Sequence, residues 1–432
     1  MESIWQNTIE TPHFEQLNED KTTDVLIIGG GITGILCAYF LQNSNIDYIL
    51  VEKDRICGET TQNTTAKITV QHSLIYQKIA EKYGIEAAQK YFKANNEALK
   101  FYESICKNID CDFEKKDNYV YSVSNRKKLE KEMSILEKIG CPASLCETPS
   151  IPIKTVGAVK VFNQAQFNPL KFISAISKDL NIYENTFVKE MIGTTAKTDK
   201  FTIKAKKVII ATHFPFINKH GLYPLKMFQH RSYVLALQNA EDVGAMFVDE
   251  SETGLSFRNY NGFLLLGGGG HRTGKKGGNW EELRRFASEI YTSATEEFHW
   301  AAQDCMTLDG IAYIGRYSKD TPDLYVASGF NKWGMTSSMT AAIILCDLVQ
   351  GKENEYESCF SPSRNMLHPQ LFINMLETSA NLLTPTLKRC PHLGCALHWN
   401  SAEHSWDCAC HGSRFTQNGE VINNPANGNL RM

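Results

Sequence analysis

Two short clusters of cysteine and histidine near the C-terminus carry the clearest chemistry in this sequence. The first places Cys390 and His392 in a Cys-x-His pattern, and the second places Cys408 and His411 in a Cys-x-x-His pattern. Each cluster offers one thiolate and one imidazole, and the spacing of the clusters is typical of a metal site. Two thiolates on one iron and two imidazoles on the other can hold a [2Fe–2S] centre, whereas a zinc ion can take all four groups together. The sequence therefore predicts a metal site with these four ligands.

The residues around these clusters resemble the Rieske family of iron–sulfur proteins. Leu393-Gly394-Cys395 closes the first cluster and Gly412-Ser413 extends the second. These extensions fit the iron–sulfur loops and have no role in zinc ligation, so they favour the Rieske interpretation over zinc. The resemblance implies a [2Fe–2S] cluster whose inner iron is bound by Cys390 and Cys408 and whose outer iron is bound by His392 and His411.

Further features follow from the same resemblance. In the respiratory-type members an extra cysteine in each loop forms a disulfide, and Cys395 and Cys410 occupy those positions here. Ser413 matches the serine that hydrogen-bonds a bridging sulfide and so tunes the cluster. The preceding segment, 374–383, reads as helix or linker where the family has several strands. We therefore expect a reduced cluster-binding lobe over residues 389–432.

A glycine-rich loop near the N-terminus predicts a dinucleotide site. An apolar strand over 24–28 leads into a Gly-Gly-Gly-Ile-Thr-Gly loop that starts at Gly29, and a helix follows. Gly29 permits the tight turn, Gly31 lets the backbone approach a pyrophosphate, and Gly34 lets the helix pack on the strand. The next strand ends at Glu52, which is placed to accept hydrogen bonds from a ribose. The helix N-terminus would then face the phosphates.

Several stretches resemble the D-amino acid oxidase/glycine oxidase family of flavoproteins. They include the hydroxyl-rich segment 58–67 and the strands over 207–212 and 324–330. The resemblance implies FAD as the nucleotide, with a helix after Trp333 pointing its amides at the flavin, where reduction builds negative charge. The residues expected to contact FAD are Gly29, Gly31, Ile32, Thr33, Gly34, Glu52, Lys53, Thr60, Thr61, Thr64, Thr65, Val188, Ala211, Thr212, Gly334, Met335 and Thr336.

The resemblance also implies the fold class: an α/β FAD-binding domain of Rossmann-like type, an α+β substrate domain, and the small β-rich cluster-binding lobe. The run Gly267–Gly270 lacks the following helix that a second nucleotide site needs, so it reads as a turn. Residues 257–267 read as a hairpin that turns at Asn261-Gly262. Residues 1–22 read as a surface arm. The expected division is 1–75, 151–215 and 300–352 for the FAD domain, 76–150 and 216–299 for the substrate domain, 353–388 for a linker with a helix, and 389–432 for the lobe.

The two cofactors together imply oxidoreductase chemistry, because a flavin accepts hydride and an iron–sulfur cluster carries single electrons. The resemblance implies a FAD-dependent dehydrogenase that oxidises a C–N bond of a small amine or amino acid by hydride transfer to flavin N5. Electrons would pass through the Rieske cluster to an acceptor protein or quinone. The alternative is a flavin/iron–sulfur redox sensor or electron-transfer protein without an amine substrate.

Positioning of the substrate would carry catalysis in such an enzyme. Arg258 and Arg231 are the candidates for a substrate carboxylate, because the guanidinium fork binds a carboxylate bidentately. Tyr260 or Tyr233 is the candidate beside them. The stronger alternative is that each arginine forms a surface or interdomain pair. Two roles are open for Lys67, which are to stabilise the reduced flavin or to pair with an acid. The His271-Arg272 pair is expected near the flavin.

The totals set outer limits on function. A chain of 432 residues allows two to three domains, and a net charge of −3 gives no general attraction to nucleic acid or anionic membrane. Apolar runs are too short for a membrane span, and the N-terminus lacks an export signal. The thirteen cysteines are mostly scattered, which suits a reducing cytoplasm. The oligomeric state is left open.

Overall fold

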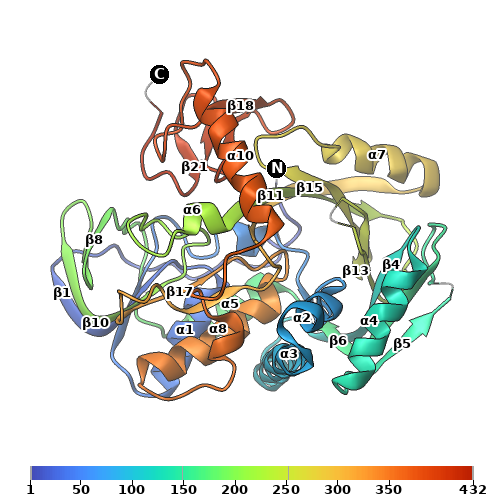
Figure 1. Ribbon diagram of the computed structural model, residues 1–432, viewed down its shortest axis with the longest axis horizontal. Helices are drawn as coiled ribbons and strands as arrows, with labels where there is room; N and C mark the ends of the chain where they lie inside the picture. The colour runs from blue at the N-terminus through green and yellow to red at the C-terminus, as the bar shows by residue number, and fades with distance from the viewer. Residues whose placement is uncertain (1, 148, 252, 431–432) are drawn as a thin grey trace.

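The computed structural model describes residues 2–147, 149–251 and 253–430. Two large β-sheets lie side by side, and a small third sheet lies at the C-terminal end of the chain (Figure 1). Helices α1 and α8 pack together below the first sheet in that view, and the C-terminal domain lies above it. This arrangement confirms the predicted fold class.

The first sheet has the strand order β16-β17-β10-β1-β2-β7, with β9 on the edge of β10 and β8 on β9. Its central strands run parallel, and their apolar residues are buried on both faces, as expected for strands covered by helices. The strands are β1 (Lys21–Ile28), β2 (Tyr48–Val51), β7 (Ile182–Tyr183), β8 (Glu190–Ile192), β9 (Thr195–Lys197), β10 (Thr202–Ile210), β16 (Tyr313–Arg316) and β17 (Leu324–Ser328).

Three helices support this sheet. They are α1 (Ile32–Asn43), α5 (Pro169–Ser177) and α8 (Gly334–Val349). Helices α1 and α8 are buried along most of their length, which explains why both are rich in small and aliphatic residues rather than amphipathic. Asn168 caps α5 by accepting hydrogen bonds from the amides of Leu170 and Lys171, and Pro169 occupies the first turn, where its missing N–H costs nothing.

The second sheet has the order β15-β11-β14-β13-β12-β4-β6-β3, with β5 on β6. Its strands are β3 (Lys67–Ile68), β4 (Glu114–Ser122), β5 (Ala143–Cys146), β6 (Gly157–Gln166), β11 (Met227–Gln238), β12 (Met246–Asp249), β13 (Ser256–Tyr260), β14 (Phe263–Arg272) and β15 (Thr295–Thr307). The remaining elements of this half are α2 (Ile75–Tyr83), α3 (Ile85–Cys106), α4 (Arg126–Lys138), α6 (Tyr223–Lys226), α7 (Asn279–Ile290) and the 3-10 turn η1 (Thr60–Asn63).

Three predicted boundaries differ from the sheets observed. Strands β3 and β6 and most of β15 lie within 1–75, 151–215 and 300–352, which were expected in the FAD domain, but all three belong to the second sheet. β6 pairs along the length of β4, and β15 pairs along the length of β11. The sequence of a strand shows that the strand is buried but not which sheet it joins. Its sheet is determined by pairing with strands that lie far away in the chain.

The glycine run Gly267–Gly270 is part of strand β14, so the prediction of a turn is wrong. A side chain at Gly267 would meet the hydroxyl of Ser256 at 2.6 Å, and one at Gly268 would meet Leu255 at 2.6 Å. The glycines are therefore explained by close neighbours, and not by a reversal of the chain. The reversal lies earlier, at Asn261-Gly262, where both residues have positive φ, as predicted from the Asn-Gly pair.

The N-terminal arm is also more buried than predicted. The side chain of Trp5 is fully buried, and its indole N–H donates to the carbonyl of Thr64 at 2.7 Å. The first residues therefore pack against the hydroxyl-rich segment that follows β2.

The C-terminal domain contains a four-stranded antiparallel sheet in the order β18-β19-β20-β21. Its strands are β18 (Leu397–Asn400), β19 (Ser405–Cys408), β20 (Arg414–Thr416) and β21 (Val421–Asn423), and the segment before it forms α9 (Glu357–Phe360) and α10 (Pro369–Leu383). The buried apolar core of this domain is small and consists largely of cysteines. Among the described residues, none of the helices is both long and apolar enough to span a bilayer.

Candidate functional site

The glycine loop lies between β1 and α1, and its glycines have different surroundings. Gly29 has φ +111°, and a side chain there would meet the carbonyl of Ala211 at 2.5 Å. A side chain at Gly34 would collide with the carbonyl of Gly29, whereas one at Gly31 would meet only the Thr61 hydroxyl at 3.5 Å. Gly29 and Gly34 therefore permit close backbone packing, and Gly31 leaves open space in front of the helix.

A cavity of about 1340 Å³ begins at this loop and continues to the start of α8. Its size and mixed polar and apolar lining fit a ligand as large as a dinucleotide. As far as the described residues go, its lining leaves out Gly34 and Thr336 among the predicted FAD contacts. It includes Gly29, Gly31, Ile32, Thr33, Glu52, Lys53, Thr60, Thr61, Thr64, Thr65, Val188, Ala211, Thr212, Gly334 and Met335.

The carboxylate of Glu52 lies at the end of β2, inside this cavity. It accepts hydrogen bonds from the amide of Gly30 at 2.7 Å and from the amide of Asp54 at 3.0 Å. Burial raises the pKa of Glu52 to about 7. A buried acceptor of this kind, held by two amides, is suited to bind ribose hydroxyls, which would add further donors.

The start of α8 faces the same cavity. No described side chain caps the helix at Trp333, so its first amides remain available to a ligand. Thr336 donates to the carbonyl of Thr69 at 3.0 Å and lies 2.8 Å from His72 Nε2. The His72 ring stacks on Trp333 at a centroid distance of 5.2 Å, and burial lowers its pKa to about 3. His72 is therefore a neutral side chain that braces the helix start, and sequence reasoning missed it.

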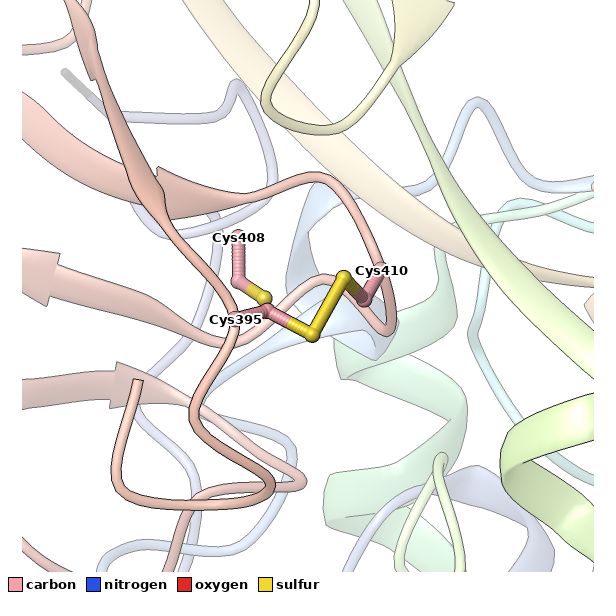
Figure 2. A group of neighbouring side chains, drawn as sticks. All are labelled: Cys395, Cys408 and Cys410. Carbon is pink, nitrogen blue, oxygen red and sulfur yellow. A yellow bond between two sulfur atoms is a disulfide. The ribbon is translucent and has the colours of Figure 1, made fainter. Parts of the chain in front are cut away.

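The two C-terminal cluster loops fold in the same way. In the first, the amide of Gly394 donates to the carbonyl of Cys390, and in the second the amide of Gly412 donates to the carbonyl of Cys408, each at 2.9 Å. Both glycines have positive φ. Cys395 and Cys410, which occupy the positions of the disulfide in the respiratory-type Rieske proteins, form a disulfide between the loops (Figure 2). Figure 2 also shows the thiol of Cys408 beside this disulfide.

The two histidines of the motifs meet at the ends of these loops. Their ring centroids are 5.0 Å apart and the rings are nearly perpendicular. The Nδ1 atoms of His392 and His411 are buried, and neither has a hydrogen-bond partner among the described residues. Burial lowers the pKa of His392 to about 4 and of His411 to about 3, so both imidazoles are neutral. Two unpartnered imidazole nitrogens and the buried thiols of Cys390 and Cys408 fit a Rieske cluster.

The cluster loops rest directly on the wall of the large cavity. Gln229 donates to the carbonyl of His411 at 2.8 Å, and Gln303 donates to the carbonyl of Gly412 at 2.9 Å. The amide of Ala426 donates to the hydroxyl of Ser413 at 3.0 Å, and Ala426 itself lines the cavity. The distance between the two sites could not be predicted from the sequence, and the structure makes them neighbours.

Family models match both parts of the chain. The model described as FAD dependent oxidoreductase matches residues 24–348, and the Rieske [2Fe-2S] domain model matches residues 371–432. This chain belongs to the FAD-dependent oxidoreductase family. Its cofactors are FAD and, in the C-terminal domain, a Rieske-type [2Fe–2S] cluster.

Two relatives of this FAD-dependent oxidoreductase support the Rieske assignment. YhfW of Bacillus subtilis (strain 168), named as a Rieske 2Fe-2S iron-sulfur protein, is 34% identical over 98% of this chain and 96% of its own length. The cytochrome b6-f complex iron-sulfur subunit of a Synechococcus strain is 46% identical over 10% of this chain and 25% of its own length.

Solved structures share the fold at low sequence identity. Glycine oxidase from Geobacillus kaustophilus superposes with a TM-score of 0.67 at 18% identity, covering 80% of this chain and 99% of that chain. L-proline dehydrogenase from P. horikoshii gives 0.66 at 17% identity, covering 80% and 98%.

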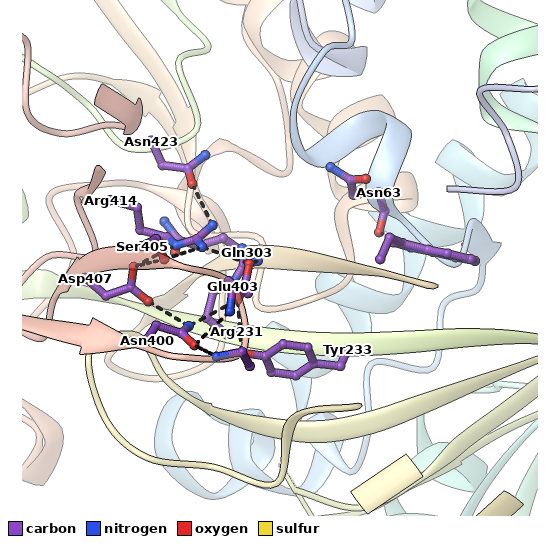
Figure 3. Close-up of polar contacts among 12 residues, drawn as sticks. Asn63, Arg231, Tyr233, Gln303, Asn400, Glu403, Ser405, Asp407, Arg414 and Asn423 are labelled. Carbon is purple, nitrogen blue, oxygen red and sulfur yellow. Dashed lines mark hydrogen bonds and ion pairs between the residues drawn. The ribbon is translucent and has the colours of Figure 1, made fainter. Parts of the chain in front are cut away.

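Of the predicted substrate residues in this oxidoreductase, Arg231 faces the Rieske domain. Its guanidinium pairs with the carboxylate of Glu403, and both side chains are almost fully buried. Glu403 also accepts from Arg414 at 2.8 Å and from the Tyr233 hydroxyl at 3.0 Å, and Arg414 pairs with Asp407 (Figure 3). Arg231 therefore forms an ion pair between the two domains, which is the alternative considered in the sequence analysis. It is not among the residues that line the cavity.

Arg258 and Tyr260 lie on β13, behind the cavity lining as far as the described residues show it. Arg258 donates to the carbonyls of Thr65 and Ala66 at 2.6 and 3.0 Å. The hydroxyl of Tyr260 donates to Asp112 at 2.6 Å. Arg258 therefore supports the hydroxyl-rich segment from behind and does not reach into the cavity.

Lys67 differs from the arginines because it lines the cavity. Its ammonium group donates to the Thr65 hydroxyl at 3.2 Å. Burial, followed by the nearby charge of Arg258, lowers the pKa of Lys67 to about 7. The His271-Arg272 pair lies instead at the Rieske interface, where Arg272 donates to the carbonyl of Ala409 at 2.9 Å.

Proposed function

We propose that this FAD-dependent oxidoreductase is a dehydrogenase of a small amine or amino acid whose electrons leave through the Rieske cluster. When bound, FAD supplies the hydride acceptor at flavin N5 and the cluster supplies a one-electron carrier. One observation carries this proposal. Ala426 contacts Ser413 in the second cluster loop and also lines the cavity proposed for FAD, so one residue touches both proposed cofactor sites. An acceptor protein or quinone would take the electrons onward.

We assign the cluster ligands from the buried donors. Cys390 and Cys408 would bind one iron, and the neutral Nδ1 atoms of His392 and His411 the other. Ser413 is placed to donate to a sulfide while its oxygen accepts from Ala426. Through Ser413, the hydrogen bonding around the cluster would depend on the position of Ala426 in the cavity wall.

On the flavin side, the uncapped start of α8 and Lys67 are the groups that would stabilise negative charge on the reduced ring. A lysine whose pKa lies near 7 can be neutral or charged with little cost, so it can respond to a change of charge beside it. Glu52 would hold the ribose. The other cavity-lining residues predicted to contact FAD would surround the rest of the cofactor.

The structure also bears on the choice of substrate residues. Arg231 is paired with the carboxylate of Glu403. Arg258 donates to backbone carbonyls through Nη1 alone, and its Nε and Nη2 atoms have no partner among the described residues, but it does not line the cavity. We therefore propose Lys67 as the remaining predicted residue at the reaction site. The buried free thiols of the flavin part, such as Cys37 and Cys346, support a reducing, cytoplasmic setting.

The deciding experiment adds a panel of small amines and amino acids to the oxidised protein without oxygen. We expect one class of compound to bleach the flavin absorbance and then to produce the paramagnetic signal of a reduced Rieske cluster. The Cys390→Ser variant serves as the matched control, because it should lose the cluster signal and keep the bleaching. Bleaching by none of the compounds, with a cluster that chemical reductants still reduce, would favour the redox-sensor alternative.

A further inference from the structure

Helix α10 has its polarity inverted relative to an ordinary surface helix. At 100° per residue, Asn374 and Asn381 lie on one face, and Phe372, Leu376 and Leu383 lie on the opposite face. Both asparagines are buried, whereas the three apolar side chains are 55%, 71% and 83% exposed. A surface helix normally buries its apolar side, so the outward face of α10 requires another explanation.

The inward face of α10 is fixed by polar contacts to both halves of the molecule. Asn374 accepts from Arg272 at 3.0 Å, and its own amide donates to the carbonyl of Leu225. Asn381 lies 2.8 Å from His398 Nε2, in the Rieske domain. Because these contacts hold the asparagines inward, the helix cannot turn its apolar face into the protein without breaking them.

The exposed apolar surface continues beyond the helix. Among the described residues, sixteen large hydrophobic side chains are exposed, and nine of them fall between positions 367 and 393. A soluble monomer rarely exposes an apolar patch above a few hundred Å², and this concentration points to a surface that is covered in use. The nine are Leu367, Phe372, Ile373, Met375, Leu376, Leu382, Leu383, Leu387 and Leu393.

We propose that this surface, residues 367–393, docks on the face of an anionic phospholipid bilayer. The outward arc of α10 carries only apolar and small residues, and it projects from a single helix rather than lining a groove. The chain contains no acidic residue between Glu377 and Glu403, whereas Lys388 and Arg389 lie within this stretch. An apolar face with adjacent cations is the chemistry of a helix that lies in the membrane interface.

The overall net charge of −3 does not oppose this proposal, because anionic lipid responds to the local charge within a Debye length. The only acid on α10, Glu377, faces inward and is paired with Lys275. The docking surface is therefore locally basic although the whole chain is not.

Docking in this way would orient the molecule. His368 and Gln370, at the start of α10, line the large cavity, and Leu393 directly follows the cluster histidine His392. Figure 1 shows α10 running from the C-terminal domain toward α2, which also lines the cavity. One end of the docking surface thus borders the cavity and the other borders the cluster. The proposal does not depend on the identity of the substrate.

Cosedimentation of the holoprotein with vesicles of equal parts phosphatidylcholine and phosphatidylglycerol tests this proposal. We expect the native chain to sediment with the vesicles and the Leu376→Glu/Leu383→Glu variant to bind about a hundredfold more weakly, since burial of each of the two leucines contributes roughly a tenfold gain. The Ile192→Glu variant is the matched control, because Ile192 is 53% exposed on β8 of the first sheet. Unchanged flavin and cluster spectra check that each variant is folded.

Two outcomes would overturn the proposal. The native chain could remain in the supernatant at every lipid concentration. Alternatively, sedimentation velocity could show a dimer that the double variant converts to a monomer, with no vesicle binding by either protein. The second result would assign the same surface to another copy of this chain.

Discussion

Two buried arginines on neighbouring parts of the second sheet have opposite electrostatic situations. Arg231, on β11, faces the carboxylate of Glu403 and so joins the flavin part to the Rieske domain. Arg258, on β13, is completely buried and has no carboxylate within ion-pair distance among the described residues. It donates to two backbone carbonyls and packs between the rings of Trp5 and Tyr260.

The pKa values of their neighbours show the consequence. Burial alone would raise the pKa of Glu403, but the charges of Arg231 and Arg414 lower it to about 2. At Lys67, burial and the charge of Arg258 act in the same direction and lower the pKa to about 7. The first arginine therefore stabilises an ionised partner, and the second opposes the ionisation of its neighbour. The first situation suits a fixed interface, and the second suits a site whose charge can change.

The largest effect is expected from Arg231→Met. The change leaves Glu403 buried with Arg414 as its remaining cation, and we expect the free energy of unfolding in urea to fall by about 3–5 kcal/mol. The double variant Arg231→Met/Glu403→Gln should be less destabilised than this single variant, because it holds no buried carboxylate that has lost one of its two arginines. Equal stability of the native chain and the single variant would contradict an interdomain role for the pair.

The next effect concerns pH. Lys67 has a folded-state pKa of about 7, below the value of about 10.4 in an unfolded chain, so the unfolded state binds more protons between these limits. Stability should therefore rise with pH from about 7 to about 10, by up to ~1.4 kcal/mol per pH unit. Urea unfolding of FAD-free protein at several pH values measures this slope, and Lys67→Met should flatten it. A slope that is the same in both proteins would show that another group titrates.

A smaller loss is expected from Arg258→Met. The removed guanidinium has only carbonyl partners, so we expect unfolding to become easier by about 1–2 kcal/mol, less than for Arg231. The pKa of Lys67 should rise, because one cause of its depression is gone. The pH dependence of urea unfolding in the same FAD-free protein reports both effects. A loss as large as that of Arg231→Met would remove the distinction between the two arginines.

The smallest effect is expected from Tyr260→Phe. The hydroxyl donates to Asp112 and accepts from the amide of Asn168 at 2.9 Å, and its loss should cost about 1 kcal/mol in thermal or urea unfolding. We expect the flavin absorbance and its reduction by substrate to remain unchanged, since Tyr260 lies behind the cavity. A changed dependence of flavin reduction on substrate concentration would contradict this prediction and would show that Tyr260 contributes to the substrate site.

The features that were predictable from the sequence depend on local geometry. Gly29, Gly31 and Gly34 are needed by a turn and a helix start that lie within a few residues of each other. The disulfide between Cys395 and Cys410 was implied by the resemblance of the two loops to the Rieske family. The Asn261-Gly262 turn was likewise readable from two adjacent residues.

The features that were missed depend on partners far along the chain. Glu403 lies 172 residues from Arg231, and no local pattern marks the two as a pair. His72 meets Thr336 across 264 residues. The glycines of β14 were misread because the side chains that crowd them belong to other strands and helices. Composition and local spacing show what a residue requires of its sequence neighbours. The Arg231–Glu403 pair, the His72–Thr336 contact and the crowding of the β14 glycines depend on residues that come together only in the folded chain.

The paired carboxylate at Glu403 has a consequence for the separability of this molecule. The Rieske portion contributes few apolar side chains of its own, and one of its buried acids is neutralised by a residue supplied from the flavin portion. Cutting the gene between the two coding regions would leave that acid with Arg414 as its remaining cation, inside a fragment that has little core to hold it. The separated Rieske portion is therefore expected to be less stable than the same portion within the whole chain.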